Sequence, residues 1–352
     1  MDFTVSDIAR LTGGKLTGPP DSIVRELLTD SRQVSYTENA AFIAIKGVNH
    51  DGHKYIDNLY RRGVKVFIAS RLPENPDLYP DASFIICQNS IDALQLLAAA
   101  KRSMFGSVVF AVTGSAGKTI VKEWLADVLG RVYPVVRSPK SYNSQIGVPL
   151  SVWKLDPLYK FGIFEAGISL PGEMEKLRRV IDPDIGIITN IGDAHSENFR
   201  DIRTKAKEKL RLFTNAKSII FSSDSPIIRE AILEDPVLRE KDLTDWSFTD
   251  RDARVFVEMS NSGNEGTLLK FTYKGSMISA VIPFRDRASI ENAVTVASAC
   301  FAVGLPDENI ADGLAELVSV AMRMELKEGI NNCQLIEDYY NSDPGSLKLA
   351  LE

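Results

Sequence analysis

Four apolar segments recur between residues 107 and 224, and they constrain the fold more than any other feature of the sequence. They are VVFAVTG (108–114), FGIFEAG (161–167), DIGIITNIG (184–192) and SIIFSSD (218–224). Continuous runs of β-branched and aromatic residues are typical of parallel strands that are covered on both faces. We therefore expect an open α/β sheet, with ligands beyond the carboxyl ends of its strands.

A smaller α/β unit is expected in the first hundred residues, and an antiparallel excursion near residues 243–280. The excursion is indicated by alternation in the stretches ARVFVEMS and LLKFTYKG. Elsewhere we predict strands at 40–45, 64–69 and 83–87, and helices at 7–11, 53–62, 91–104, 292–303 and 308–317. A chain of 352 residues with this rhythm is expected to hold two or three domains.

Composition disfavours several classes of protein. The net charge is −6 without a long basic run, so nucleic-acid binding is not expected. The sequence predicts neither a membrane span nor a signal peptide. The three cysteines, Cys87, Cys300 and Cys333, have neither a disulfide framework nor metal-binding spacing. We expect a cytoplasmic protein whose local loops can still bind anions.

The segment AVTGSAGKTIVKEW (111–124) resembles a phosphate-binding loop that is too short. The usual spacing is G-x-x-x-x-G-K-[ST], whereas only two residues separate Gly114 from Gly117. A strand precedes the loop and a helix follows it, so backbone N–H groups would face a phosphate. Lys118 can approach the β- and γ-phosphates, and Thr119 can offer its hydroxyl to Mg²⁺. A nucleotide site is favoured over a plain glycine turn with a surface lysine.

Two further polar residues follow predicted buried strands. Glu165 is either a Mg²⁺ ligand opposite Thr119 or a solvent-facing residue at a strand end, and taken alone the two interpretations are even. His195, in TNIGDAHSENF, could bind a metal or a phosphate, although a loop histidine is more often structural.

The remaining candidate site segments are a charged helix and two polar clusters. In KAKEKLRLF, Lys205 and Lys209 share one helical face, and a solvated helix is the ordinary interpretation. The polar clusters TDSRQV (29–34) and KGVNHDGHKYI (46–56) lie beside predicted strands. Arg32 and nearby backbone N–H groups could hold a diphosphate there.

These motifs occur together, in order, in one family. The sequence resembles the Mur ligases, the ATP-dependent amide-forming enzymes of peptidoglycan synthesis, over essentially the whole chain. The resemblance rests on DSRQV, FIAIKGVNHDGH, TGSAGKT, YNSQIGVPL, FEAGISLPGE, TNIGDAH, the lysine helix, Asn292 and RME at Arg323. The short loop is that family's form of the phosphate-binding loop. One departure is Ala288-Ser289, where the family usually has His-Asn.

The resemblance implies roles for individual residues. Its implied ATP contacts are Thr113, Gly114, Ser115, Ala116, Gly117, Lys118, Thr119, Asn292, Arg323 and Asp338. Its implied metal ligands are Thr119, Glu165, His195 and Lys209, the last as a carbamate that helps to bind a second Mg²⁺. Its implied substrate contacts are Ser31, Arg32, Lys46, Gly47, Asp51, His53, Asn143 and Gln145. Lys118, Lys209, His195 and Glu165 would carry the catalysis.

The resemblance also implies an organisation and a substrate. Residues 1–103 would bind a UDP precursor, 104–322 would form the central ATP-binding domain, and 323–352 would be a hinge and the start of a truncated, Rossmann-like C-terminal domain. The segment EDYYNSDPGSL (337–347) is similar to the hinge of the MurF type. That type adds D-alanyl-D-alanine to UDP-N-acetylmuramoyl-tripeptide through an acyl phosphate, and it uses ATP and Mg²⁺.

Alternatives stay open at this point. A ligase of the MurE type would add a single amino acid to the dipeptide precursor, and a folylpolyglutamate-type ligase is disfavoured by the DSR-containing first domain. A non-catalytic nucleotide-binding module is the alternative from a different class. We expect the chain as given to bind its ligands but to turn over poorly, because the third domain has barely begun. A full-length protein fused to an alanine racemase is compatible with the resemblance.

Overall fold

The computed structural model describes residues 2–32, 37–192, 198–263, 266–320, 325–328 and 333–337. The chain forms two compact units, which are described separately. The first unit comprises Met1–Gly106 with Gln145–Pro157, and the second comprises Ser107–Ser144 with Leu158–Glu352. The segment Gln145–Pro157 therefore packs with N-terminal residues, although it lies inside the range 104–322.

The first unit is built on a five-stranded sheet of order β2-β7-β6-β5-β4. Strands β4 to β7 run parallel, and β2 joins the edge of β7 antiparallel. The strands are β1 (Phe3–Thr4), β2 (Lys15–Thr17), β3 (Ile23–Val24), β4 (Glu26–Leu28), β5 (Ala40–Ile43), β6 (Val66–Ala69) and β7 (Ser83–Ile86). The helices are α1 (Val5–Thr12), α2 (Ile56–Arg61), α3 (Ser90–Ser103) and α5 (Gly147–Val152), with 3₁₀ turns at Gly52–Tyr55 and Pro76–Leu78.

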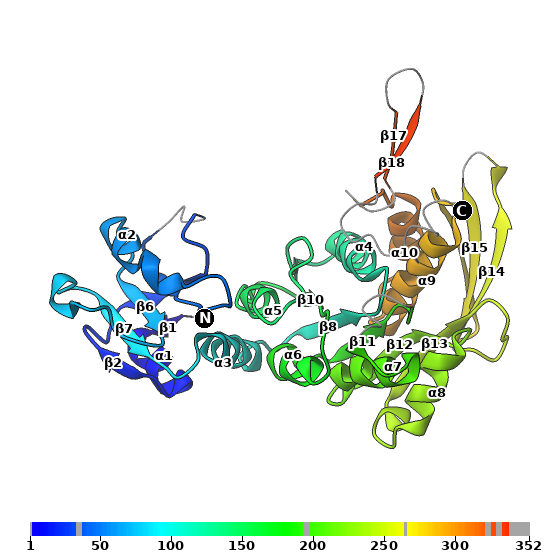
Figure 1. Cartoon of the computed structure of the whole chain (residues 1–352). Coiled ribbons are helices and arrows are strands. Elements are labelled where there is room, and N and C mark those ends of the chain that lie inside the picture. Colours follow the sequence, from blue (N-terminus) through cyan, green and yellow to red (C-terminus); the bar gives the residue numbers. More distant parts are fainter. Residues whose placement is uncertain are drawn as a thin grey trace. The chain divides into compact units, whose positions relative to one another are not determined.

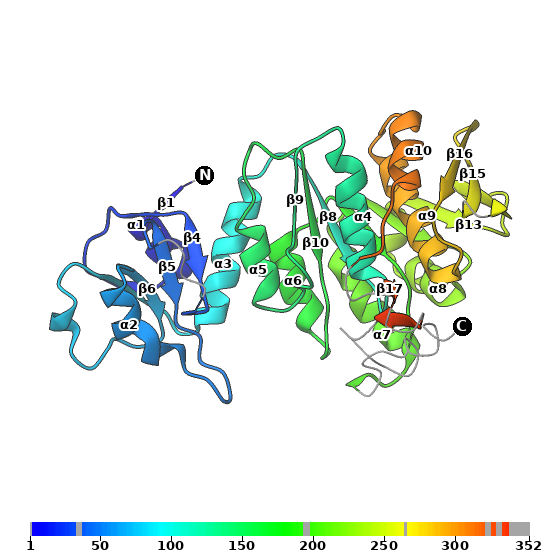
Figure 2. The same ribbon diagram turned by 90° about the horizontal axis from the view of Figure 1, so that it is seen from above.

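Local sequence signals fix where the helices of the first unit begin and end. Thr4 and Asp7 form a capping box at the start of α1, and Gly13 ends that helix in the left-handed conformation. Asn89 caps α3 by accepting from the N–H groups of Ile91 and Asp92. Apolar side chains of α1 and α3 pack on one face of the sheet and those of α2 on the other. Figure 2 shows the ribbon of this unit with the three helices labelled.

The second unit is built on a nine-stranded sheet of order β16-β15-β14-β13-β12-β11-β8-β10-β9. All pairs from β9 to β14 are parallel, and β14, β15 and β16 form an antiparallel extension. The strands are β8 (Val108–Thr113), β9 (Val135–Arg137), β10 (Phe161–Glu165), β11 (Ile185–Ile188), β12 (Ser218–Ser222), β13 (Asp242–Ser247), β14 (Val255–Asn261), β15 (Thr267–Tyr273) and β16 (Ser276–Ile282). Both the predicted parallel sheet and the predicted antiparallel excursion are confirmed.

Helices cover both faces of this sheet (Figure 1). One layer contains α4 (Lys118–Gly130), α9 (Arg287–Ala302) and α10 (Asp307–Ala315), and the other contains α6 (Glu173–Ile181), α7 (Ile202–Leu210) and α8 (Pro226–Glu234). Short 3₁₀ turns lie at Arg211–Phe213 and Leu238–Glu240, and β17 (Glu325–Glu328) pairs with β18 (Gln334–Glu337). No helix in the described part of the chain is long and apolar enough to cross a membrane.

The order of the central strands places the candidate residues. Strand β8 lies between β10 and β11, and all three run parallel. Their carboxyl ends therefore meet at one edge of the sheet, where Gly114 follows β8, Glu165 ends β10 and Thr189 follows β11. Ligands of open α/β sheets bind outside such an edge.

Candidate active site

The glycine loop needs both of its glycines. Gly114 has φ 148° and Gly117 has φ 78°, a region that residues with a Cβ rarely adopt. A Cβ at Gly114 would collide with the Thr189 hydroxyl, and one at Gly117 with the Asn292 side chain. The second contact brings Asn292, from α9, directly against the loop. The predicted ATP contacts at the loop and at Asn292 are thus brought together.

Residues after β11 hold this loop in place. The carbonyl of Asn190 accepts from the Ser115 N–H at 2.8 Å, and its Oδ1 accepts from the Ala116 N–H at 2.8 Å. The Thr189 hydroxyl donates to the Ala116 carbonyl at 2.6 Å. Ser115 Oγ accepts from the Gly192 N–H at 2.9 Å. The segment 189–192 therefore fixes the conformation of the loop from the neighbouring strand.

Thr119, which directly follows the glycine loop, and Glu165, at the end of β10, form a buried hydroxyl–carboxylate pair. The Thr119 hydroxyl donates to Glu165 Oε2 at 2.8 Å, and Glu165 is only 1% exposed. Asn143 Nδ2 donates to Glu165 Oε1 at 2.6 Å, and Ser141 Oγ lies 3.2 Å from Thr119 Oγ1. The structure thus places Glu165 inside the site rather than at a solvent-facing strand end.

Two lysines of α7, Lys205 and Lys209, are buried. Lys209 is 3% exposed, and its Nζ donates to the Gly114 carbonyl at 3.0 Å. Lys205 is also buried and donates to the Gly192 carbonyl. Burial holds the pKa of Lys209 well below its usual range, and the nearby charges of Lys118 and Lys205 act in the same direction. The solvated-helix interpretation is wrong for this face.

Other predicted residues of the second unit have different placements. Lys118 Nζ donates to the carbonyl of Ser115 at 3.0 Å, within its own loop. The Thr113 hydroxyl is buried and donates to the carbonyl of Ala166. The remaining predicted contacts of this unit, His195, Arg323 and Asp338, lie outside the described residues.

The polar clusters of the first unit also follow parallel strands. Arg32 donates to both oxygens of Asp30, and these bonds hold the pKa of the Asp30 carboxyl at about 2. The Ser31 carbonyl accepts from Arg62 Nη1 at 2.7 Å. Arg32 is 87% exposed, so its guanidinium faces solvent.

A second cluster of the first unit is built around His53. Its Nε2 accepts from the Ser70 N–H at 3.1 Å, so Nδ1 carries the proton that bonds Asp51 Oδ1 at 2.6 Å. Arg71 donates to the other oxygen of Asp51, and this bond is the main cause of that carboxyl's lowered pKa. Asp51 also bridges to Lys46 through the backbone.

The remaining predicted substrate contacts are Gly47, Gln145 and Asn143. The Gly47 N–H donates to the carbonyl of His50 at 2.8 Å, closing the turn before Asp51. Gln145 belongs to the first unit, where Gln95 Nε2 donates to its side-chain oxygen at 3.0 Å. Asn143 belongs to the second unit, so the two predicted neighbours are assigned to different compact units.

The donor set at the loop fits Mg²⁺ and a nucleotide phosphate. Hydroxyl and carboxylate oxygens are the protein ligands that Mg²⁺ prefers, and Thr119 and Glu165 supply one of each. Among the described residues, no group of three His, Cys, Asp or Glu side chains could hold a metal by itself. The single carboxylate of Glu165 beside the Thr119 hydroxyl suits Mg²⁺, which is usually bound by one or two carboxylates together with phosphates and waters.

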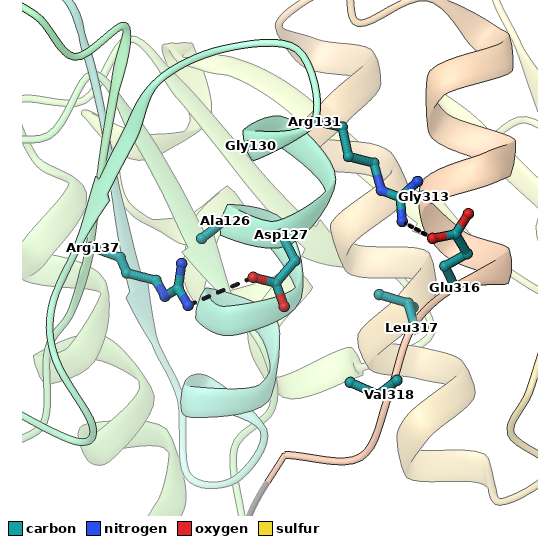
Figure 3. A pocket seen from close by; sticks show the side chains of 9 residues that line it. All are labelled: Ala126, Asp127, Gly130, Arg131, Arg137, Gly313, Glu316, Leu317 and Val318. Carbon is teal, nitrogen blue, oxygen red and sulfur yellow. Dashed lines mark hydrogen bonds and ion pairs between the residues drawn. The ribbon is translucent and has the colours of Figure 1, made fainter.

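A cavity of about 350 Å³ lies elsewhere in the second unit (Figure 3). It is lined by Ala126, Asp127, Gly130, Arg131, Arg137, Gly313, Glu316, Leu317 and Val318. Arg131 pairs with Glu316 and Arg137 with Asp127 across its wall. Because its α4 residues come from the last turn, it is at the far end of that helix from the glycine loop. It is not part of the site described above.

Several residues of the site were not assigned from the sequence. Asn190 stands out beside His195 in TNIGDAH but has no role assigned from the sequence, and neither have Thr189, Ser138 and Ser141. Ser138 Oγ accepts from the Glu165 N–H at 3.1 Å, so it fixes the backbone of the carboxylate. Thr189 and Asn190 follow directly after the buried strand β11, and that position is the signal that could have found them. Ser138 and Ser141 follow β9, which has one buried residue and gives no such signal.

The fold and the loop define a nucleotide-binding α/β domain that carries a hydroxyl–carboxylate pair suited to Mg²⁺. Comparisons with known proteins narrow this class. The model of the Mur ligase middle domain matches residues 112–300, and that of the Mur ligase family catalytic domain matches residues 24–102. The chain belongs to the Mur ligase family, whose members are ATP-dependent ligases.

Individual relatives agree with the family. The chain is 30% identical over 354 residues to UDP-N-acetylmuramoyl-tripeptide–D-alanyl-D-alanine ligase of Bacillus subtilis, covering 99% of this chain and 74% of the relative. It is 28% identical over 360 residues to the ligase of that name from Escherichia coli, covering 100% and 76%.

Solved structures show the same fold. MurF from Acinetobacter baumannii has a TM-score of 0.88 at 22% identity and covers 99% of this chain and 75% of that chain. MurF from Thermotoga maritima, solved in complex with ADP, has a TM-score of 0.80 at 24% identity and covers 93% and 74%.

Proposed function

We propose that this protein forms an amide bond between UDP-N-acetylmuramoyl-tripeptide and D-alanyl-D-alanine at the expense of ATP, in peptidoglycan synthesis. The observation that carries the proposal is the buried pair of Thr119 and Glu165 beneath a glycine loop that begins α4. The substrates are taken from relatives that match over nearly the whole chain and bear this activity in their names. We place the reaction in the cytoplasm, in line with the family.

The chemistry requires activation of a carboxylate. An oxygen of the tripeptide carboxylate attacks the γ-phosphorus of ATP, which forms an acyl phosphate and releases ADP. The amine of D-alanyl-D-alanine then attacks the acyl carbon, and inorganic phosphate leaves while the nitrogen loses a proton. Catalysis rests on positioning and on neutralising the charge of the phosphates.

Each step uses groups of the second unit. The N–H groups of the loop and the ammonium of Lys118 would bind the β- and γ-phosphates. Thr119 and Glu165 would hold Mg²⁺, with His195 as a further ligand, and bound Mg²⁺ would neutralise charge on the transferred phosphoryl group. Asn292, Arg323 and Asp338 would contact the rest of ATP. Asn143 would lie beside the reacting carboxylate.

Lys209 would act as a carbamate. Its neutral amine would add to CO₂ with loss of one proton, giving an anionic side chain that could bind a second Mg²⁺. The support is its burial, its bond to the Gly114 carbonyl and its lowered pKa, since only an uncharged amine reacts in this way. A lysine kept as a cation would instead be costly at 3% exposure.

The first unit would hold the UDP part of the precursor. Ser31 and Arg32 follow β4, and Lys46, Gly47, Asp51 and His53 follow β5, so both groups lie beyond the carboxyl edge of that sheet. The guanidinium of Arg32 would face a diphosphate. Gln145 would extend the substrate contacts from the same unit.

The amine substrate distinguishes this proposal from its alternatives. ADP formation would be measured with the purified full-length protein, a panel of UDP-precursors, and either D-alanyl-D-alanine or single amino acids. We expect ADP to form with the tripeptide precursor and the dipeptide amine. Activity only with a single amino acid and the dipeptide precursor would assign the MurE-type reaction instead. Nucleotide binding without ADP formation under any condition would favour a non-catalytic module.

A further inference from the structure

A second buried lysine, Lys122, lies one helical turn beyond Lys118 on α4. Its side chain is fully buried, at 0% exposed. Its Nζ donates to the Ser138 carbonyl at 2.8 Å and also to the Lys140 carbonyl, and it pairs with Glu123 Oε1 at 2.7 Å. A buried ammonium is unfavourable unless its donors are satisfied, and here two carbonyls and a carboxylate satisfy them.

The two carbonyls belong to one turn, residues 138–143, which connects β9 to the site. The backbone of this turn is unusual because Lys140 has φ 48°, a left-handed conformation without a glycine. Such conformations persist only where the surroundings impose them. Lys122 bonds the carbonyl of Lys140 itself, so it acts at the position where the backbone is least favourable.

The same turn surrounds the hydroxyl–carboxylate pair. At its start, Ser138 Oγ accepts from the Glu165 N–H at 3.1 Å. In its middle, Ser141 Oγ lies 3.2 Å from Thr119 Oγ1. At its end, Asn143 Nδ2 donates to Glu165 Oε1 at 2.6 Å. Three residues of the turn thus orient the two groups that would bind Mg²⁺.

We propose that Lys122 is a positioning residue for the Thr119–Glu165 pair, which it orients through the 138–143 turn. Lys122 forms its hydrogen bonds and ion pair with Ser138, Lys140 and Glu123 rather than with either member of the pair, so it is not a catalytic residue. The inference rests on the proposed function only in assigning the pair to a nucleotide-bound Mg²⁺. Groups that orient metal ligands matter because their loss weakens metal binding or activity by about 10–100-fold.

The test is the Mg²⁺ dependence of nucleotide binding. The affinity for a non-hydrolysable ATP analogue would be measured by calorimetry over a range of Mg²⁺ concentrations, with no peptide substrate present. We expect Lys122→Met to raise the half-saturating Mg²⁺ concentration by roughly 10-fold or more. A purely structural role would lower the fraction of folded protein without moving this midpoint.

The matched control is Lys101→Met in the first unit. Lys101 is also buried, at 6% exposed, and lies 5.2 Å from the Trp153 ring of its own unit, whereas the turn belongs to the second unit. Its variant should leave the Mg²⁺ midpoint unchanged. An unshifted midpoint in folded Lys122→Met, or an equal shift in Lys101→Met, would overturn the proposal.

A second variant covers the case in which Lys122→Met does not fold. Lys122→Arg keeps the charge but spreads its donors, so we expect a smaller shift in the same direction, and no shift would overturn the proposal. Failure of the Lys122 proposal can be distinguished from failure of the proposed ligase function. Wild-type protein with Mg²⁺-dependent nucleotide binding but no dipeptide addition would refute the proposed function and leave the role of Lys122 standing.

Discussion

The two units place their candidate residues in the same way, but the Asp30–Arg32 pair of the first unit and the charged groups of the second lie in opposite environments. In each unit the residues follow the carboxyl ends of parallel strands, after β4 and β5 in the first and after β8, β10 and β11 in the second. The first unit presents Arg32 at 87% exposure, whereas the second buries Lys209 at 3% and Glu165 at 1%.

This difference in side-chain exposure predicts how the two sites should respond to substitutions. An exposed ion pair forms at little cost in desolvation and contributes little to stability. A buried charge is unfavourable unless specific partners or bound ligands satisfy it. Substitutions in the second unit should therefore have large effects on activity, and those in the first unit small effects on stability. The following predictions run from the largest expected effect to the smallest.

Replacing Lys209 should have the largest effect. We expect Lys209→Ala to lower the rate of phosphate release on the order of 100-fold, because a proposed metal-binding anion is lost. Added bicarbonate should not restore the rate. Carbon-13 NMR of protein exposed to labelled bicarbonate should show a carbamate signal in the wild type and none in the variant.

The control for Lys209 lies on the same helix. Lys207 is 53% exposed and pairs with Glu234, so Lys207→Ala should keep full activity and the carbamate signal. Full activity in Lys209→Ala would refute the carbamate role and remove the contrast between the two units.

The second-largest effect is expected from replacing Gly117, which should weaken nucleotide binding. The left-handed backbone and the contact with Asn292 both oppose a Cβ at this position. A strain of about 1–3 kcal/mol in the loop corresponds to roughly 5- to 150-fold in the dissociation constant. Calorimetry with ATP would measure the loss in Gly117→Ala. Gly130→Ala, where a Cβ meets nothing, should bind as the wild type does.

Removing the side chain of Asn190 should destabilise the loop moderately. The Ala116 N–H would lose its acceptor, which costs about 1–3 kcal/mol when the donor stays out of water. Denaturant unfolding would report the difference in the free energy of unfolding. Asn215→Ala removes an exposed amide that bonds Asp182 and should change the unfolding midpoint far less. Equal changes in the two variants would show that Asn190 does not hold the loop.

The exposed pair of the first unit should give the smallest effect, and one that depends on pH. The folded-state pKa of Asp30 is about 2, below its unfolded value near 4, so its contribution is present above about pH 4 and is lost as the pH falls toward 2. The small difference in stability between wild type and Asp30→Asn should shrink over that window. A difference that grows on acidification would contradict this assignment.

Much of the fold could be predicted because apolar patterns report burial directly. The runs at β8, β10, β11 and β12 are continuous because helices cover both faces of the sheet. Short or mixed elements escaped prediction, among them β9, with three residues. The segment with α5 packs on the first unit although it lies between β9 and β10 in sequence, and that long-range contact leaves no local signal.

The candidate site was predicted where spacing carries the chemistry and missed where contacts cross between loops. Gly114, Gly117 and Lys118 form a local motif, so their sequence suffices. Asn190 and Lys122 act on segments 74 and 16 residues away, through bonds to Ala116 and to the Ser138 carbonyl. The inward turn of Lys209 also depends on tertiary packing, since the helix alone favours solvent exposure.

The central claim is that the site activates a carboxylate by phosphorylation. The direct measurement uses UDP-precursor labelled with oxygen-18 in the terminal carboxylate of its tripeptide, together with ATP, Mg²⁺ and D-alanyl-D-alanine. An acyl phosphate passes one labelled oxygen to the phosphate that leaves. We predict one oxygen-18 atom in the inorganic phosphate for each amide bond formed, detected by mass spectrometry. Amide formation with unlabelled phosphate would contradict the account.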